Sequence, residues 1–334
     1  MRITKIVRNF GTFAGILLLL VFLVSCERHD YELLDPDSAG VWTLFDTNDG
    51  LPGNNVSDIR LDSKDNLWLT FPGQGVAKYS DGTWTNYKTT TSQILSNTVS
   101  CVAETSDGSL IFGTADGISI LSKTDTWSSY LDPLGTMIVS AVKVASDGSV
   151  WVGTAGQGFY INTGSGFVRT TIPAYNTITV NAIEEDFSGD IWIATNNGLV
   201  KWDGSSFTTL NVANGLPNRK ISSLLRDSKR KLWIGTRGGK TVSWIDAKGI
   251  HQLSLLNGRD SCNINKIFED RRGNVWFATA SDGLIKYNGV IPYIYKTNNG
   301  FPENTINSIG EDKYGNLWFG LATKGVVRYT LPIN

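Results

Sequence analysis

The chain has 334 residues, 41% of them hydrophobic and 18% charged, so it is long enough and apolar enough to bury a sizeable core. The net charge is -1, and no basic field is present that could hold a nucleic acid, which excludes that class of partner. The 35 glycines and 11 tryptophans suit a protein with many turns and aromatic strands.

Residues 1–25 have the pattern of a bacterial lipoprotein signal peptide. Arg2, Lys5 and Arg8 form a positive region, and the apolar run that follows is too short to span a membrane comfortably. The run ends at Leu23-Val-Ser-Cys26, which resembles a lipobox. The resemblance implies cleavage before Cys26 and attachment of a lipid to its sulfur. The alternative is a signal peptide in which this cysteine is incidental.

Residues 26–40 are acidic and polar and show no hydrophobic period, which predicts a tether between the lipid and the folded part. Glu27, not an aspartate, follows the cysteine. By analogy with enterobacterial sorting, this favours the outer membrane and leaves the leaflet open. We therefore expect a lipid-anchored protein of the cell envelope.

Residues 41–334 form a sevenfold repeat that has a period of about 42 residues. The copies align on one anchor residue, and the spacing between anchors varies only from 40 to 43 residues. A period of this size is the sequence signature of propellers and related repeat folds. The anchors are Trp68, Ile111, Trp151, Trp192, Trp233, Trp276 and Trp318.

Each copy predicts four short strands, here called A to D. In the first copy they are Val56–Ile59, Leu67–Thr70, Gly75–Tyr79 and Trp84–Tyr87, each rich in β-branched or aromatic residues and bounded by turn formers. Alternation of this kind in every copy predicts an all-β fold. We expect a seven-bladed β-propeller of four-stranded blades.

The two ends of the repeat predict how the ring closes. The last copy ends after its strand C, at Arg328-Tyr329, and has no strand D. Val41–Phe45 precedes the first copy and matches the strand D pattern. The N-terminal strand should therefore complete the last blade, which removes an open sheet edge.

The turn between strands A and B repeats with constant spacing. An aspartate stands six residues before most anchors and should bond backbone donors of its own turn, although Thr105 and Ala145 replace it in two copies. This replacement favours a structural role over a calcium site. Glycine stands three residues before five anchors and predicts positive φ. Arg230 occupies that position in the fifth copy and predicts local strain there.

Three further features predict how the blades pack. The tryptophan anchors should fill the space between adjacent blades, and the small residue two positions after most anchors should let neighbouring sheets approach. Cys101 and Cys262 lie in distant copies, so we expect buried thiols and no disulfide. A polar side chain on each strand A should line a hydrated central channel. These polar residues are Ser57, Ser100, Ser140, Asn181, Ser222, Asn265 and Asn307.

The repeat resembles the two-component regulator propeller repeat. The resemblance is carried by Asp186-Phe-Ser-Gly-Asp-Ile-Trp-Ile-Ala-Thr195 followed by Gly198-Leu-Val-Lys-Trp202, and the other copies follow this pattern. It implies a relationship to periplasmic sensors of hybrid histidine kinases that read glycan fragments in Bacteroidetes. No transmembrane helix or kinase follows the repeats, so we expect a stand-alone form that phosphorylates nothing.

A ligand site is expected in the loops that join strand D to strand A and strand B to strand C. These loops share one face and differ between copies, whereas the A–B turns are uniform. Amides, cations and an aromatic residue suit sugar hydroxyls or carboxylates, the alternative being an ordinary solvated rim. The fifth copy departs most from the repeat and carries a basic sector. The candidate ligand-binding residues are Asn55, Gln157, Tyr175, Asn197, Arg219, Lys220, Arg237 and Lys240.

Three classes of function remain open at this point. The first is a monomeric binding or sensing module for a glycan or an envelope protein. The second is a propeller enzyme of the lyase or glycosidase type, but His29 lies in the tether, His251 lies on an outer strand, and Glu303 and Asp260 have no evident partner for acid–base work. The third is a scaffold in an envelope complex. We expect no catalytic residue, no metal and no cofactor.

Overall fold

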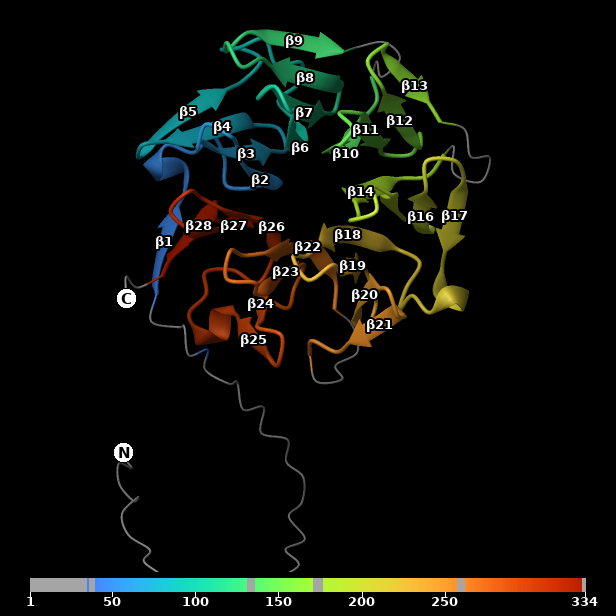
Figure 1. Cartoon of the computed structure of the whole chain (residues 1–334). Helices are drawn as coiled ribbons and strands as arrows, with labels where there is room; N and C mark the ends of the chain where they lie inside the picture. The colour runs from blue at the N-terminus through green and yellow to red at the C-terminus, as the bar shows by residue number, and fades with distance from the viewer. Residues whose placement is uncertain (1–34, 36–39, 131–135, 171–176, 257–261, 332–334) are drawn as a thin grey trace, which may run out of the picture. The chain divides into compact units, whose positions relative to one another are not determined.

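A computed structural model describes residues 35, 40–130, 136–170, 177–256 and 262–331. Residues 33–334 form one compact unit, and all the strands belong to it. Seven antiparallel four-stranded sheets surround a central axis as the blades of a propeller, which confirms the predicted fold (Figure 1). The predicted signal peptide, Cys26 and most of the predicted tether lie outside the described residues.

The four strands of each blade follow one another outward from the axis (Figure 1). The innermost strands, from blade one to blade seven, are β2 (Asp58–Leu61), β6 (Val99–Glu104), β10 (Val139–Val144), β14 (Val180–Glu185), β18 (Ile221–Arg226), β22 (Ile264–Glu269) and β26 (Ile306–Glu311). The second strands carry the anchors and are β3 (Leu67–Phe71), β7 (Leu110–Thr114), β11 (Val150–Thr154), β15 (Ile191–Thr195), β19 (Leu232–Thr236), β23 (Val275–Thr279) and β27 (Leu317–Leu321).

The outer half of each blade follows the same order. The third strands are β4 (Gly75–Ser80), β8 (Gly117–Leu121), β12 (Phe159–Asn162), β16 (Gly198–Trp202), β20 (Val242–Asp246), β24 (Leu284–Tyr287) and β28 (Val326–Thr330). The outermost strands are β5 (Thr83–Tyr87), β9 (Trp127–Tyr130), β13 (Phe167–Arg169), β17 (Phe207–Leu210), β21 (Gly249–Leu253), β25 (Pro292–Tyr295) and, in blade seven, β1 (Val41–Phe45). Short 3-10 helices η1 (Thr47–Asp49), η3 (Val212–Asn214) and η4 (Thr297–Asn299) lie in connections between blades.

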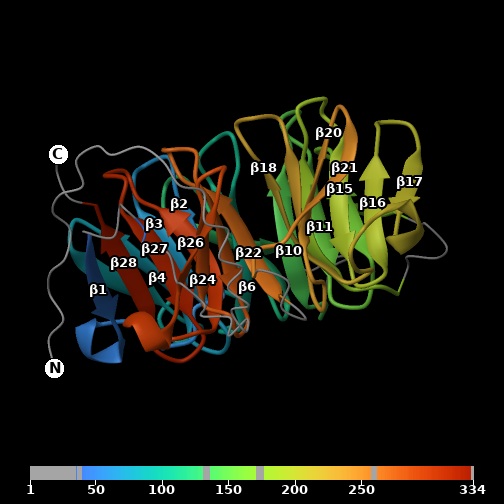
Figure 2. The same cartoon turned by 90° about the horizontal axis from the view of Figure 1, so that it is seen from below.

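The ring closes through the first strand, as the sequence predicts. Strand β1 pairs antiparallel with β28, with Val41 opposite Thr330 and Phe45 opposite Val326. The rings of Trp42 and Tyr329 lie 4.2 Å apart, so the closing strand is held by aromatic packing as well as by its backbone. Figure 2, turned by 90°, shows β1 beside β28 at the edge of blade seven.

In five of the seven blades, a bond that sequence reasoning missed links the aspartate of the A–B turn to the tryptophan anchor. In blade five, Asp227 Oδ1 accepts the backbone amides of Lys229 and Lys231, as expected. Its Oδ2 also accepts the indole Nε1 of Trp233 at 2.8 Å. Because the tryptophan is buried, its N–H needs a protein acceptor, and the six-residue spacing supplies one.

The remaining expectations for the turn are confirmed. Glycine at the position three before the anchor has positive φ, as in Gly189 at 84°, and Asp65 and Arg230 adopt φ of 67° and 65° there. Arg230 therefore bears the predicted strain, since a non-glycine side chain disfavours this region. Its guanidinium lies 5.2 Å from the ring centroid of Phe187 in the preceding blade.

Adjacent blades share their cores, which explains the small residue after each anchor. A Cβ added at Gly153 would lie 2.3 Å from Cγ1 of Val180 in the next blade, so only glycine permits this approach. Trp233 packs in one cluster with Ile264 and Phe277 of blade six. Cys101 and Cys262 are free and buried, which confirms the prediction for both thiols.

Candidate functional site

The propeller has two unlike ends, which we call the loop face and the turn face. The loop face carries the D–A connections and the B–C loops, and the turn face carries the A–B and C–D turns. On the loop face, backbone bonds join neighbouring loops: Gly198 N donates to Arg219 O at 2.7 Å, and Arg237 N donates to Lys220 O at 2.9 Å. These bonds hold the connection that precedes blade five against the B–C loops of blades four and five.

Three cations gather on the loop face of blade five, where the sequence predicts a basic sector. Arg219, Lys220 and Arg237 are exposed, and no carboxylate in the described part of the chain pairs with them. Arg237 also lines the mouth of the central channel. Unpaired cations close together repel one another and favour an anionic ligand.

Two asparagines add hydrogen-bond donors to this sector. Asn218 Oδ1 accepts the backbone amide of Lys220 at 3.0 Å, and Asn263 Oδ1 accepts that of Gly238 at 2.7 Å. Within the described residues, neither Nδ2 group makes a hydrogen bond. The amide oxygens are thus occupied while the N–H groups remain available, which again favours an acceptor-rich ligand.

The other predicted site residues are spread over the loop face. Lys240 is exposed in the same B–C loop as Arg237, and Asn197 is exposed next to Gly198. Gln157 lies in the B–C loop of blade three, and Asn55 lies at the channel mouth, where its Oδ1 accepts Asn307 Nδ2. Tyr175 lies outside the described residues. The structure thus brings the blade five residues and Asn197 together but leaves Gln157 and Asn55 on other blades.

The central channel, of about 770 Å³, is lined by the ring of polar side chains predicted from strand A. Six of these side chains also donate a hydrogen bond to a carbonyl of the next blade, which ties neighbouring blades together. The pairs are Ser57 to Val99, Ser140 to Val180, Asn181 to Ile221, Ser222 to Ile264, Asn265 to Ile306 and Asn307 to Val56. The ring therefore has the packing role that the sequence predicts.

One ion pair in the channel was missed by sequence reasoning. Lys266 of blade six donates to Asp58 Oδ1 of blade one at 3.0 Å, and Ser308 of the intervening blade donates to the same oxygen at 3.2 Å. The carboxylate raises the pKa of Lys266. Both residues occupy the same position of the repeat, ten residues before the anchor. Only copies one and six carry a charged residue at that position, and this was the available signal for the pair. Their contact could not be read from the sequence because 208 residues separate them.

The buried thiols offer no reactive group to the site. Burial raises the pKa of Cys101 to about 12, with the nearby Asp58 carboxylate adding to the effect. Burial likewise raises the pKa of Cys262 to about 12. Both thiols thus stay protonated at neutral pH, which leaves them inert as nucleophiles.

Two other groups considered for catalysis already have hydrogen-bond partners. His251 lies on β21 and bonds Asp246, and Glu303 accepts the amide and hydroxyl of Thr323. Among the described residues, no group of three or more metal-ligating side chains converges. No helix in the described part of the chain is long and apolar enough to cross a membrane.

Comparison with known families identifies the repeat. The two component regulator propeller model matches residues 215–238, 258–281 and 300–322. These segments match two component regulator propeller repeats. These matches fall in copies five to seven and include the Gly215-Leu-Pro-Asn218 loop beside the basic sector. No curated protein matches the chain.

Solved structures share the fold of these repeats. The extracellular domain of a protein described as a hybrid two component system from B. thetaiotaomicron aligns with a TM-score of 0.75 at 22% identity, covering 88% of this chain and 41% of that one. Virginiamycin B lyase from Staphylococcus aureus, solved with quinupristin, aligns with a TM-score of 0.71 at 16% identity. This alignment covers 88% of this chain and 100% of the lyase chain. PorZ, a surface component of the type-IX secretion system of Porphyromonas gingivalis, aligns with a TM-score of 0.69 at 16% identity. This alignment covers 86% of this chain and 48% of the PorZ chain.

The chain spans less than half the length of the first and third of these structures. Their identities to this chain are low, so the likeness concerns the propeller fold. The propeller is akin in fold to the extracellular domains described for hybrid two component systems.

Proposed function

We propose that this chain is a ligand-binding module of an envelope sensing system and that it recognises an anionic glycan on the loop face of blade five. The observation that carries the proposal is the cluster of Arg219, Lys220 and Arg237, which are exposed and have no carboxylate partner among the described residues. Arg237 of this cluster lines the mouth of the polar channel. The Nδ2 groups of Asn218 and Asn263 add donors that suit the hydroxyl and carboxylate oxygens of such a ligand.

The likeness in fold to the extracellular domain of a hybrid two component system, together with the matched repeats, supports a sensing role. We further propose that Cys26 carries a lipid and that the propeller is held at the outer membrane by its tether. This part of the proposal rests on the lipobox-like Leu23-Val-Ser-Cys26. A Cys26→Ala variant should leave the membrane fraction and appear in the soluble envelope fraction. Retention of that variant in membranes would contradict the anchor without affecting the proposed ligand site.

The ligand proposal is tested with a soluble form that begins at Leu33, because residues 33–334 are one compact unit that includes the closing strand. Trigalacturonate should bind, and the neutral galactose trimer should bind at least tenfold more weakly, by calorimetric titration. Arg219→Ala and Arg237→Ala should each weaken binding about tenfold, since each removes charged hydrogen bonds of ~1.5 kcal/mol.

Lys248→Ala is the matched control, because Lys248 is exposed on the turn face of the same blade. It should bind trigalacturonate like the wild type, and all three variants should melt at the wild-type temperature. Equal binding of the charged and neutral trimers, or no loss in the two arginine variants, would contradict the proposal. A protein partner captured through the loop face, with no binding of acidic glycans, would assign a protein ligand instead.

An enzymatic function has weaker support. The lyase neighbour shares the fold at 16% identity, and the described part of the loop mouth lacks a histidine. Glu303 is engaged by Thr323, so it is not poised for acid–base work at the basic sector. The unchanged mass of trigalacturonate after incubation with the soluble form is the expected result, and its cleavage would favour the enzyme.

A further inference from the structure

A groove on the turn face lies at the opposite end of the molecule from the loop face. It runs between the A–B turns of blades six and seven and has a volume of about 600 Å³. Arg271 and Arg272 line it from the first turn, and Lys313 and Tyr314 line it from the second. The sequence suggests a uniform structural face here, because the turns share their spacing. The exposed side chains of these two turns nevertheless differ from those of the other blades.

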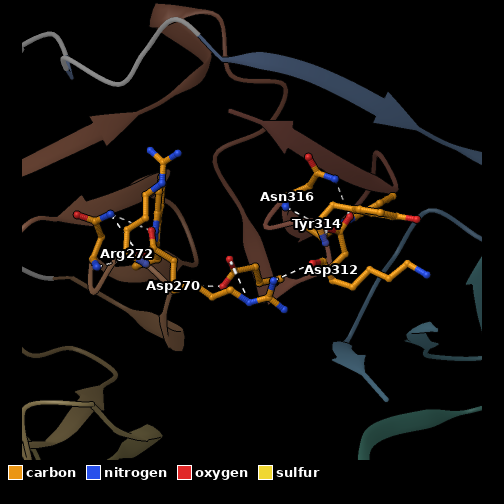
Figure 3. A network of polar contacts seen from close by, with 11 residues as sticks. Asp270, Arg272, Asp312, Tyr314 and Asn316 are labelled. Atoms are coloured by element: carbon orange, nitrogen blue, oxygen red, sulfur yellow. Dashed lines mark hydrogen bonds and ion pairs between the residues drawn. The ribbon is translucent and has the colours of Figure 1, made fainter. Parts of the chain in front are cut away.

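The carboxylates beside this groove are already committed. Asp270 Oδ1 accepts the backbone amides of Arg272 and Asn274, and its Oδ2 accepts the indole of Trp276 at 2.7 Å (Figure 3). Asp312 holds the turn of blade seven in the same way, through the amides of Tyr314 and Asn316 (Figure 3). Their negative charge is therefore directed into the turns and away from a ligand.

Glu311 is committed as well. Its Oε2 accepts the backbone amide of Arg271 at 3.0 Å, and its Oε1 lies 3.8 Å from Nε of the same arginine. Burial raises the pKa of Glu311, so this carboxyl is protonated more readily than an exposed glutamate. Arg271 also donates from Nη1 to Lys313 O at 2.8 Å, which bridges the two turns.

The Arg272 guanidinium, by contrast, is available, and Lys313 is held only by a long ion pair. Arg272 is exposed, and its guanidinium has no hydrogen-bonded or ionic partner among the described residues. Lys313 Nζ lies 3.9 Å from Asp65 and 5.1 Å from the ring centroid of Tyr314. The Tyr314 side chain is 75% exposed, so the outer face of its ring is uncovered.

A second aromatic residue with cations beside it lies on the same face. Phe187, 44% exposed in the A–B turn of blade four, has the guanidinium groups of Arg226 and Arg230 at 4.8 and 5.2 Å from its ring. Arginine and aromatic side chains are the residues most enriched at the energetic centres of protein interfaces. Two such groups, spread over the turns of blades four to seven, exceed what a single small ligand would contact.

We propose that the groove between the turns of blades six and seven docks an acidic segment of a protein partner. Carboxylates of the segment would pair with Arg272 and Lys313, since a guanidinium binds a carboxylate in a bidentate fork. An apolar side chain of the segment would cover the Tyr314 ring. The propeller would then receive its ligand on one face and contact a protein on the other.

The probe is an Asp- and Glu-rich peptide that contains leucine, titrated by calorimetry or fluorescence anisotropy into the soluble form that begins at Leu33. The same peptide with Asn and Gln in place of the acids is the charge control. The acidic peptide should bind at least tenfold more tightly. Its affinity should fall as salt rises, because exposed charges are screened over about 8 Å at physiological ionic strength.

Variants of the groove should separate charge from aromatic contact. Arg272→Ala should weaken peptide binding about tenfold, and Tyr314→Ala about fivefold, with unchanged melting because both side chains are exposed. The matched control is Lys64→Ala, an exposed cation in the A–B turn of blade one, which should leave peptide binding unchanged. Arg219→Ala and Arg237→Ala should also leave it unchanged, so the test does not depend on the loop-face proposal.

Four results would overturn the inference. The first is equal binding of the acidic and neutral peptides, and the second is wild-type peptide affinity in Arg272→Ala. The third is a combined result: trigalacturonate binds more tightly than the peptide, and Arg272→Ala loses the binding of trigalacturonate. That result would assign a glycan to the groove. Loss of peptide binding only in the Arg219 and Arg237 variants would likewise place the peptide on the loop face.

Discussion

Replacement of Asp62 by alanine should destabilise the propeller by about 3 kcal/mol. Its Oδ1 accepts the amides of Lys64 and Asn66, and its Oδ2 accepts Trp68 Nε1 at 2.7 Å. The indole is 2% exposed, so water cannot replace the carboxylate there. An unsatisfied buried donor costs about 1–3 kcal/mol, and the two more accessible amides add about 1 kcal/mol.

Blade three supplies a natural rescue for this variant. It has Ala145 in place of the aspartate, and Ser149 Oγ accepts the indole of Trp151 at 3.0 Å. Ser149 stands two residues before its tryptophan, as Asn66 stands before Trp68. The double variant Asp62→Ala/Asn66→Ser should therefore recover about 1 kcal/mol of the loss, although Asn66→Ser alone should not stabilise the protein.

Equilibrium unfolding in guanidinium chloride, followed by tryptophan fluorescence, measures these differences as shifts of the transition midpoint at constant slope. Asp116→Ala is the matched control, because Asp116 is exposed and its carboxylate accepts no hydrogen bond in the described part of the chain. It should change stability by less than about 0.5 kcal/mol. A loss below about 1 kcal/mol for Asp62→Ala, or no recovery in the double variant, would refute the reasoning.

Other predictions follow from buried groups. Asp35→Asn should lower the free energy of unfolding by about 3–5 kcal/mol, because Lys286 Nζ lies 2.9 Å from the carboxylate and both residues are buried. Adding Lys286→Met should restore part of the loss. An unchanged unfolding midpoint in Asp35→Asn would contradict the pairing. Cys101 and Cys262 should not react with Ellman's reagent at pH 8 while the soluble form is folded, and two thiols should react once it is unfolded. Reaction of either thiol in the folded protein would contradict their burial. Ser222→Ala should lower the free energy of unfolding by about 1 kcal/mol in the same assay, because its bond to the next blade is lost. No change in stability would contradict the packing role of the polar side chains that line the channel.

The fold could be predicted because its determinants recur at fixed spacing. Five of the seven copies show the Asp–Trp separation, and six show the small residue two positions after the anchor. The missing last strand reveals the closing role of Val41–Phe45. The spacing did not reveal the bond from Trp233 Nε1 to Asp227, because that bond depends on the geometry of the turn. Repetition identifies positions under constraint, and only coordinates show the atoms that impose it.

The site was harder to predict because it depends on contacts between copies. Arg219, Lys220 and Arg237 could be grouped, because the fifth copy visibly departs from the repeat. Residues that meet across long separations gave no such signal. Asp35 was assigned to the acidic tether, yet it is buried against Lys286, 251 residues away. The turn-face groove was missed because constant turn spacing conceals the variation of the exposed side chains.

Hydrogen–deuterium exchange of the soluble form with and without trigalacturonate tests the central claim most directly. Binding at blade five should slow exchange in the segments 215–220 and 237–241, because a ligand held by Arg219, Lys220 and Arg237 shields those loops. The A–B turn of the same blade, residues 227–231, should exchange at the same rate in both states. Protection confined to that turn or to the groove of blades six and seven, or no protection at saturating ligand, would contradict recognition on the loop face.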